Sequence, residues 1–267
     1  MDMPRNAFKH AIAAGRPQIG AWLMSGAPST AEALGSLGFD FLVVDTEHVP
    51  IDVPQMIEIL RAVAGTTASP VTRVPWNDTV MVKRAMDAGA QTIMFPFVQD
   101  ADEARRAVAA TRYPPQGIRG VAGVHRASRY GTVPNFLKVA NAEACVVVQI
   151  ETPTALERLH DIAAVDGVDA IFVGPGDLSA AMGHLGDIAH ADVQARLAHA
   201  AAECKRLGKP CGIVGPNPEM VERFLGYGYT WVAVGSDMSM MVGRAQEWLG
   251  RLRGHAPAPA PKTQGAY

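Results

Sequence analysis

Two acidic residues stand where two successive strands are expected to end. Glu151 closes the apolar run VVVQIE, and Asp177 follows the run AIFVGPG, 26 residues further along the chain. One strand–helix unit separates them, so both carboxylates should reach the same side of a parallel sheet. Two oxygen ligands with room for substrate and water oxygens suit a hard divalent ion such as Mg²⁺ or Mn²⁺ better than zinc. We therefore predict a metal site at Glu151 and Asp177; the alternative is that each caps the helix that follows it.

Two basic side chains also follow expected strands. Arg73 ends the run VTR among apolar neighbours, where an unpaired guanidinium is unfavourable, so it should face an anion. That anion is either a reacting group or, as a structural alternative, Asp45 or Glu47. His48 ends VVDTEH, and an imidazole titrates near neutrality, which suits a general base. A lone loop histidine is as often structural.

The absence of other motifs argues against several classes of reaction. None of the six lysines falls at an expected strand end, where a Schiff-base lysine would be needed, so a metal must stabilise any enolate. The chain has no nucleophile elbow, phosphate-binding loop or dinucleotide fingerprint after a strand. The turn 174–176 (Gly-Pro-Gly) opens a helix and offers backbone N–H groups to a carboxylate or phosphate, although such turns are more often connectors.

The elements that must position these residues alternate in a regular order. Eight short apolar runs, mostly without alternation, indicate parallel strands that are buried on both faces, and amphipathic helices lie between them. The runs begin near Ile19, Phe41, Val71, Thr92, Val146, Ala170, Cys211 and Trp231. Eight strand–helix units in 267 residues predict an α/β fold, a single-domain (β/α)8 TIM barrel, over residues 1–254. An open doubly wound sheet is the alternative, because periodicity cannot show closure.

Two segments depart from this pattern. One connection, 99–144, contains a helix at 101–111 and then a long excursion, and loops of this length tend to be functional or to lie at interfaces. Its arginines could receive anionic substrate ends, brace a subunit contact or form a solvated basic face. They are Arg112, Arg119, Arg126 and Arg129. Residues 255–267 are rich in Pro and Ala and are predicted to form an extended or disordered tail.

Composition limits the possible partners and location. A net charge of −2 gives no electrostatic footprint for nucleic acid or an anionic membrane. No apolar run reaches the roughly 18 residues that span a bilayer. The three cysteines are scattered and in no metal-binding spacing, which indicates reduced packing thiols. We expect a cytoplasmic protein.

Five segments of the chain match the sequence pattern of a known family. The segments VVDTEHVPID, VTRVPWND, DEARRAVAATRYPPQGIRGV, VVVQIETPTAL and GVDAIFVGPGDLSAAMG resemble the HpcH/HpaI aldolase family, over nearly the whole chain. The resemblance implies a class II pyruvate aldolase on a (β/α)8 barrel. It also implies a homohexamer with exchanged C-terminal helices.

The resemblance carries site roles over residue by residue. Glu151 and Asp177 match the metal ligands, and Gln149, Gly176 and Asp177 match substrate contacts. The implied cofactor is a divalent ion, Mg²⁺, Mn²⁺ or Co²⁺.

The same resemblance assigns three catalytic residues. Arg73 matches an arginine that stabilises the enolate, His48 matches the base, and Asp87 matches an aspartate that raises the basicity of that histidine. The expected elements conflict with the last role, because Asp87 ends the helix after the third strand and should point to the opposite barrel face. Asp45 and Glu47 compete for the same role.

The implied reaction is the reversible cleavage of a 4-hydroxy-2-oxo acid, such as 4-hydroxy-2-oxoheptanedioate, to pyruvate and an aldehyde. An alternative substrate is a 2-keto-3-deoxy sugar acid of the deoxyglucarate or rhamnonate type. The chain is one residue shorter than the resembled enzymes near 124–126, in the excursion that helps to choose the aldehyde. A CoA-thioester lyase is less favoured, since it would need a nucleotide groove. The presence of Glu151, Asp177, Arg73 and His48 argues against a catalytically silent barrel.

Overall fold

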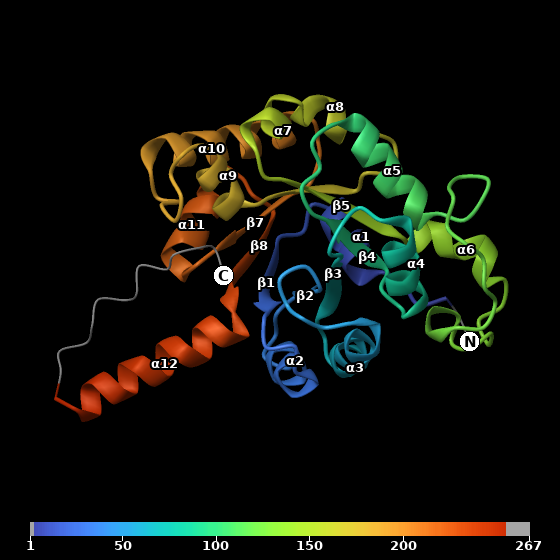
Figure 1. Cartoon of the computed structure of the whole chain (residues 1–267), viewed down its shortest axis with the longest axis horizontal. Helices are drawn as coiled ribbons and strands as arrows, with labels where there is room; N and C mark the ends of the chain where they lie inside the picture. Colours follow the sequence, from blue (N-terminus) through green and yellow to red (C-terminus); the bar gives the residue numbers. More distant parts are fainter. Residues whose placement is uncertain (1–2, 255–267) are drawn as a thin grey trace.

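Eight parallel strands form a closed barrel in the computed structural model, which describes residues 3–254 (Figure 1). The strands pair in chain order, and β1 also pairs with β8, which closes the sheet. The predicted barrel is confirmed, and the open sheet is wrong. The strands are β1 (Gln18–Leu23), β2 (Phe41–Asp45), β3 (Ser69–Arg73), β4 (Thr92–Phe95), β5 (Cys145–Ile150), β6 (Ala170–Val173), β7 (Cys211–Gly215) and β8 (Trp231–Ser236).

Helices return the chain from the end of each strand to the start of the next, and their first residues carry the expected signals. Asp78 caps α4 through the N–H groups of Val80 and Met81, and Asp100 caps α5 through Glu103. The helices are α1 (Ala7–Ala13), α2 (Pro28–Gly35), α3 (Val53–Ala64), α4 (Thr79–Asp87), α5 (Ala101–Thr111), α6 (Phe136–Glu143), α7 (Pro153–Glu157), α8 (Leu159–Ala163), α9 (Pro175–Ala181), α10 (Ala191–Arg206), α11 (Pro218–Tyr227) and α12 (Asp237–Leu252).

Two apolar layers account for the buried strands. One face of each strand packs against the helices, and the other fills the barrel interior with large side chains. In the interior, Trp231 packs at 5.6 Å from Phe41 and 5.1 Å from Phe172, measured between ring centroids. Phe8 of α1 plugs the N-terminal end of the barrel, 5.3 Å from Trp231. The interior is therefore a packed core, and the buried charged pair Asp45 and Arg73 lies at its C-terminal end, where the mouth begins.

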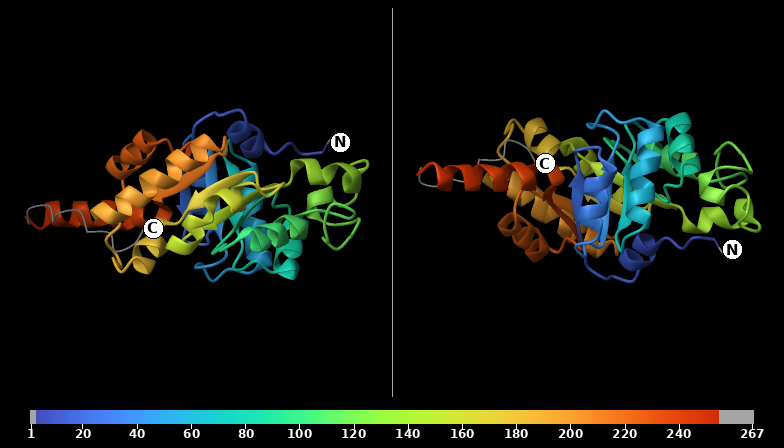
Figure 2. Two further views of the ribbon diagram at one scale, coloured as in Figure 1. Left: turned by 90° about the horizontal axis from the view of Figure 1, so that it is seen from above. Right: turned by 90° about the horizontal axis from the view of Figure 1, so that it is seen from below.

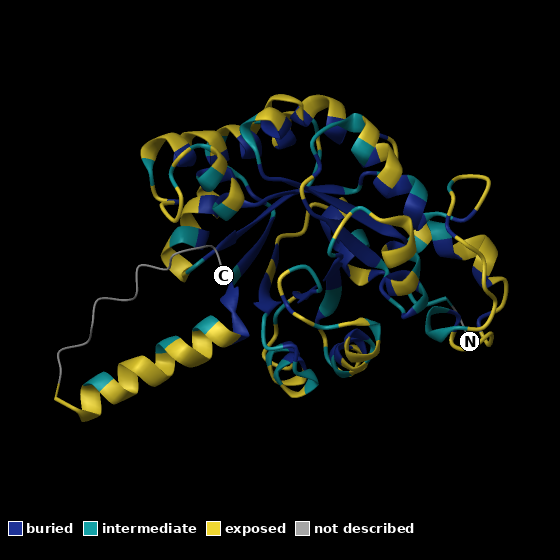
Figure 3. Ribbon diagram, in the orientation of Figure 1, coloured by how far each residue is buried: buried dark blue, intermediate teal, exposed yellow. Residues whose placement is uncertain are grey.

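The long excursion and the last helix project in opposite directions along the long axis (Figure 2). The excursion contains a short 3-10 helix (Arg126–Ser128) and α6. The last helix, α12, leaves β8 and extends away from the barrel, and only Asp237, its first residue, is buried (Figure 3). Its exposed face carries large apolar side chains, including Met241, Trp248 and Leu252.

The predicted tail, residues 255–267, lies outside the described residues. Within residues 3–254, no helix has the length and apolar character needed to cross a membrane.

Candidate functional site

The floor of the barrel mouth holds a fully buried ion pair. Nε of Arg73 donates to Oδ1 of Asp45 at 3.0 Å, and Nη2 donates to Oδ2 at 2.6 Å. Nη1 lies 3.0 Å from Oε2 of Glu47. The guanidinium also lies over the ring of Trp22, 5.0 Å from its centroid. Neither Arg73 nor Asp45 exposes its side chain to solvent, so each charge depends on the other.

Strand register creates this pair, because Asp45 is the direct neighbour of Arg73 between β2 and β3. Burial by itself would raise the pKa of Asp45. The bonds from Arg73 and from the backbone N–H groups of Glu47 and His48 outweigh burial and hold the pKa below its ordinary value. The structural alternative for Arg73 is therefore present, and the chain itself supplies the anion that Arg73 was predicted to face. Its action on a substrate enolate stays a prediction.

His48 lies at the rim above this pair. Its side chain is 51% exposed, and its Nε2 lies 3.9 Å from Oε2 of Glu47. Its backbone N–H donates to Oδ1 of Asp45 at 3.4 Å. Burial raises the pKa of Glu47, against the opposing charges of Arg73 and His48. Among the carboxylates proposed to assist His48, Glu47 lies beside the ring and Asp45 beneath its backbone.

Asp87 lies elsewhere. It ends α4, which runs from the mouth back toward the N-terminal end of the barrel. There Nη2 of Arg119 donates to its Oδ1 at 2.7 Å, and Nε2 of His125 lies 3.6 Å from the same oxygen. A single chain thus does not bring Asp87 to His48, as its position in the helix predicted. Any role of Asp87 in raising the basicity of His48 stays a prediction and requires a second copy of the chain.

Glu151 follows β5 and is almost fully buried. The N–H of Phe97 donates to its Oε2 at 2.7 Å, and Nε2 of Gln149 donates to its Oε1 at 3.0 Å. Phe97 has a left-handed backbone (φ 56°), an unfavourable conformation that tends to occur at functional sites. Oε1 of Gln149 is buried and has no hydrogen-bond partner within residues 3–254.

Gly174 leaves the space that Glu151 occupies, because a Cβ at position 174 would collide with Oε1 of that carboxylate. Gly174 also precedes α9, and Asp177 lies exposed in the first turn of that helix. Thr152 caps α7 by accepting the N–H of Ala155. The capping alternatives for Glu151 and Asp177 are therefore wrong.

Neighbouring carboxylates oppose the ionisation of Glu151. Burial and then the charge of Asp177 raise the pKa of Glu151 from 4.5 to about 8, and Glu47 adds to the shift. A divalent cation would remove this penalty by letting the carboxylates ionise together. The buried, unpartnered oxygen of Gln149 provides a further hard donor nearby. The residues present therefore fit Mg²⁺ or Mn²⁺, which prefer oxygen ligands.

This pKa predicts a pH-dependent affinity for the ion. Between pH 4.5 and about 8, the folded metal-free protein holds a proton on Glu151 that the unfolded chain has lost, so its stability falls as pH rises through that window. An ion must displace the same proton. We expect the apparent affinity for Mn²⁺, measured by titration calorimetry, to rise about tenfold from pH 6 to 7 and less steeply as pH approaches 8. An affinity independent of pH would show that the ion displaces no proton from Glu151 in this range.

The remaining predicted residues lie near this group. Gly176 precedes Asp177 in the first turn of α9, and its carbonyl accepts the hydroxyl of Ser179 at 2.7 Å. Of the described lysines, none follows the C-terminal end of a strand. The disfavoured imine route therefore has no amine at the mouth within residues 3–254.

Two participants at the mouth were missed in the sequence. Asp237 follows β8 and accepts the N–H of Met24 at 2.7 Å and of Ser25 at 3.2 Å, which ties the loop after β1 to the rim. Its position after the last strand is the same signal that identified Glu151, so it could have been found. Phe97 carries no such signal, because its contribution is a backbone N–H. Its ring stacks with Trp76 at 6.5 Å.

Comparison with known proteins agrees with this geometry. The model of a family described as HpcH/HpaI aldolase/citrate lyase matches residues 18–243. A 2-dehydro-3,6-dideoxy-6-sulfogluconate aldolase of Pseudomonas putida is 52% identical, with 92% of this chain and 96% of that protein covered. A 5-keto-4-deoxy-D-glucarate aldolase of Salmonella arizonae is 49% identical, with 88% and 92% covered. A solved structure of an HpcH/HpaI aldolase/citrate lyase family protein from Burkholderia cenocepacia has a TM-score of 0.90 at 40% identity, with 93% of this chain and 99% of that chain covered.

Proposed function

Because this chain belongs to the HpcH/HpaI aldolase/citrate lyase family, we propose that it is a divalent-metal-dependent aldolase that cleaves a 2-keto-3-deoxy sugar acid to pyruvate and an aldehyde. The observation that carries the proposal is the group of opposed carboxylates around Glu151 at the mouth of the barrel. We further propose a cytoplasmic location, since the three cysteines are free and buried.

The choice of substrate rests on the relatives. A heptanedioate and a deoxy sugar acid share the 4-hydroxy-2-oxo head and differ in the tail that leaves as the aldehyde. The head is what a metal, a base and a charge-stabilising arginine act on, so the site residues are the same for both. Two relatives at 52% and 49% identity carry names of sugar-acid aldolases, and the sugar acid therefore replaces the heptanedioate as our preferred substrate.

The chemistry can be assigned to this chain's own groups. When bound at Glu151 and Asp177, a divalent ion supplies Lewis-acid polarisation of the 2-oxo group. His48 removes the proton of the 4-hydroxyl group, the C3–C4 bond breaks, and its electron pair stays on C3 as pyruvate enolate. The fragment that begins at C4 leaves as the aldehyde. Arg73, which Asp45 holds at the floor of the barrel mouth, stabilises the negative charge that develops on the enolate oxygen. Return of the proton from His48 to C3 then gives pyruvate and restores the base.

We expect pyruvate release to depend on both ion and substrate class. With Mg²⁺, Mn²⁺ or Co²⁺, a 2-keto-3-deoxy sugar acid should be cleaved with a higher kcat/KM than 4-hydroxy-2-oxoheptanedioate, and malyl-CoA should give no product. Excess EDTA should abolish turnover, and each ion should restore it. Full activity in EDTA, or covalent trapping by borohydride in the presence of pyruvate, would disprove the metal route.

We propose that the enzyme works as a homo-oligomer, a hexamer, in which Asp87 of one copy assists His48 of another. Two observations support this: Asp87 and His48 lie on different ends of one barrel, and α12 exposes apolar side chains away from its own barrel. An apolar helical face of this kind requires a partner surface.

Subunit mixing tests this arrangement. His48→Ala and Asp87→Asn should each be nearly inactive alone, and co-assembly in equal amounts should restore activity to about a quarter of the sites, since random pairing reunites both intact residues that often. Mixing His48→Ala with Glu151→Gln is the matched control and should restore nothing, because these residues serve the same mouth of one chain. No recovery in the first mixture would refute the shared site.

A further inference from the structure

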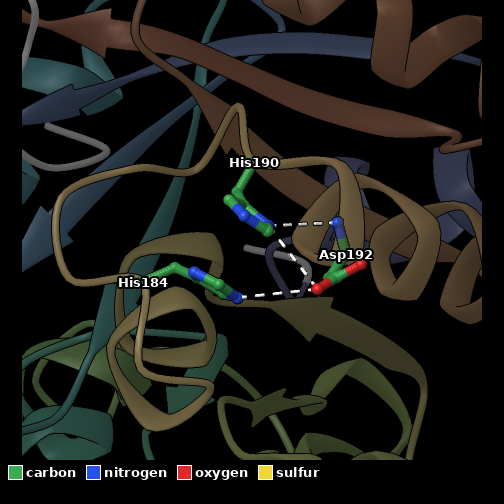
Figure 4. A group of neighbouring side chains, drawn as sticks. All are labelled: His184, His190 and Asp192. Carbon is green, nitrogen blue, oxygen red and sulfur yellow. Dashed lines mark hydrogen bonds and ion pairs between the residues drawn. The ribbon is translucent and has the colours of Figure 1, made fainter.

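A second cluster of metal-ligating side chains lies outside the mouth described above. His184, His190 and Asp192 come from the loop between α9 and α10 and from the first turn of α10 (Figure 4). Each offers one ligand atom, and these atoms lie within 4.8 Å of one another. Among the residues that the structure describes, no other group of three His, Cys, Asp or Glu side chains meets this condition. The proposed aldol chemistry does not use this cluster.

The spacing is wrong for hydrogen bonds and close to that of ligands around one ion. Nε2 of His184 and Nδ1 of His190 both lie 3.8 Å from Oδ2 of Asp192, beyond hydrogen-bond reach. The two imidazole rings stack with centroids 3.6 Å apart and an angle of 17°. Two ligands at about 2.1 Å in a tetrahedron are separated by about 3.4 Å, so the spacing of the ligand atoms suits one ion. Because a metal–nitrogen bond lies in the plane of its ring, the two stacked rings would have to rotate out of parallel on binding.

We propose that His184, His190 and Asp192 form a site for a borderline divalent transition-metal ion of the Zn²⁺ type. Two imidazoles and one carboxylate are the ligand set that such ions prefer, whereas Mg²⁺ prefers the all-oxygen site at the mouth. The side chain of Asp192 is 72% exposed, which leaves room for water to complete the coordination. Nδ1 of His190 now accepts the N–H of Asp192 at 3.2 Å, so binding exchanges one helix-capping hydrogen bond for a metal bond.

The backbone already holds the site in place. The N–H of His184 donates to the carbonyl of Ser179 in α9, and the side chain of Gln194 in α10 donates to the carbonyl of Ile188 in the loop. A bound ion would therefore tie the end of α9 to the start of α10. Since α9 carries Asp177 in its first turn, the site also braces the element that positions the mouth.

Zinc binding to the full chain tests the proposal. Equilibrium dialysis with ⁶⁵Zn²⁺ is carried out in excess Mg²⁺ and in the Glu151→Gln background, so that the mouth does not contribute. We expect one zinc ion per chain, and at least about tenfold weaker binding in His184→Gln and in His190→Gln. His160→Gln is the matched control, because His160 lies 3.3 Å from the carboxylate of Asp161 but outside the cluster.

A second readout separates metal loss from misfolding. In the same Glu151→Gln background, zinc should raise the Tm of the protein with and without His160→Gln, and should raise it clearly less after His184→Gln or His190→Gln. Co²⁺ in place of zinc should give the intense visible absorption of a four-coordinate site in the same proteins. Absence of stoichiometric zinc, or equal binding by the folded His184→Gln and control proteins, would overturn the proposal.

Discussion

Replacing Glu151 with glutamine is expected to remove divalent-ion binding and turnover together, with a loss in kcat/KM of at least about a thousandfold. The glutamine side chain has the same size as that of glutamate and can still accept a hydrogen bond from the N–H of Phe97. It lacks the negative charge that a divalent ion requires. Mn²⁺ titration and the pyruvate assay on the same preparation measure the two losses.

The stability of Glu151→Gln should rise while its activity falls. This difference separates loss of the metal site from loss of the fold. Because burial raises the pKa of Glu151 to about 8, ionising it destabilises the metal-free protein as pH approaches that value. Glu151→Gln should therefore have a higher Tm than the metal-free wild type at pH 8. Glu157→Gln, the same change at an exposed position of the next helix, is the control and should alter neither quantity. A Glu151→Gln enzyme that binds Mn²⁺ normally would remove Glu151 from the site.

Replacing Arg73 with lysine is expected to reduce kcat by on the order of a hundred- to a thousandfold and also to lower the Tm. Lysine keeps the positive charge but loses the planar fork, and one ammonium group cannot reproduce both bonds to Asp45 and the contact with Glu47. A prediction made from the sequence alone, in which Arg73 is free to face substrate, would leave the fold nearly unchanged. The buried pair in the structure adds the loss of stability.

Two measurements divide the functional role from the structural one. The kcat must be expressed per folded molecule, with folding followed by circular dichroism on the same sample. Asp45→Asn is the matched variant, since it breaks the same pair and leaves the guanidinium in place. If Arg73→Lys is destabilised as much as Asp45→Asn but retains kcat, the planar guanidinium of Arg73 is not needed for the reaction and its role is structural.

The barrel could be predicted from the sequence because the residue pattern of each strand identifies it without knowledge of its neighbours. Continuous apolar runs such as FLVVD mark strands buried on both faces, and the observed starts differ from the predicted ones by two residues or fewer. The residues that follow each run then lie at the mouth, which is how Glu151 and Asp177 were predicted as ligands.

What could not be predicted depends on contacts between strands and on backbone conformation. Asp45 and Glu47 were both named as possible partners of Arg73, but only the structure shows that Asp45 binds Nε and Nη2 while Glu47 lies beside Nη1. The left-handed conformation of Phe97 has no sequence signal, since the residue is not glycine. The direction of α12 was equally hidden, because an amphipathic pattern does not say which surface will cover the apolar face.

In the proposed oligomer, the order of the projecting helix α12 should depend on the protein concentration. A 16-residue helix with one buried residue has little to hold it helical in water, because isolated helices of this length are marginal. Its order must then follow mass action with whatever surface covers it. We expect amide hydrogen exchange in residues 240–252 to accelerate on dilution, while the barrel strands keep the same rates. Dilution would thus loosen one end of the molecule long before it unfolds the rest.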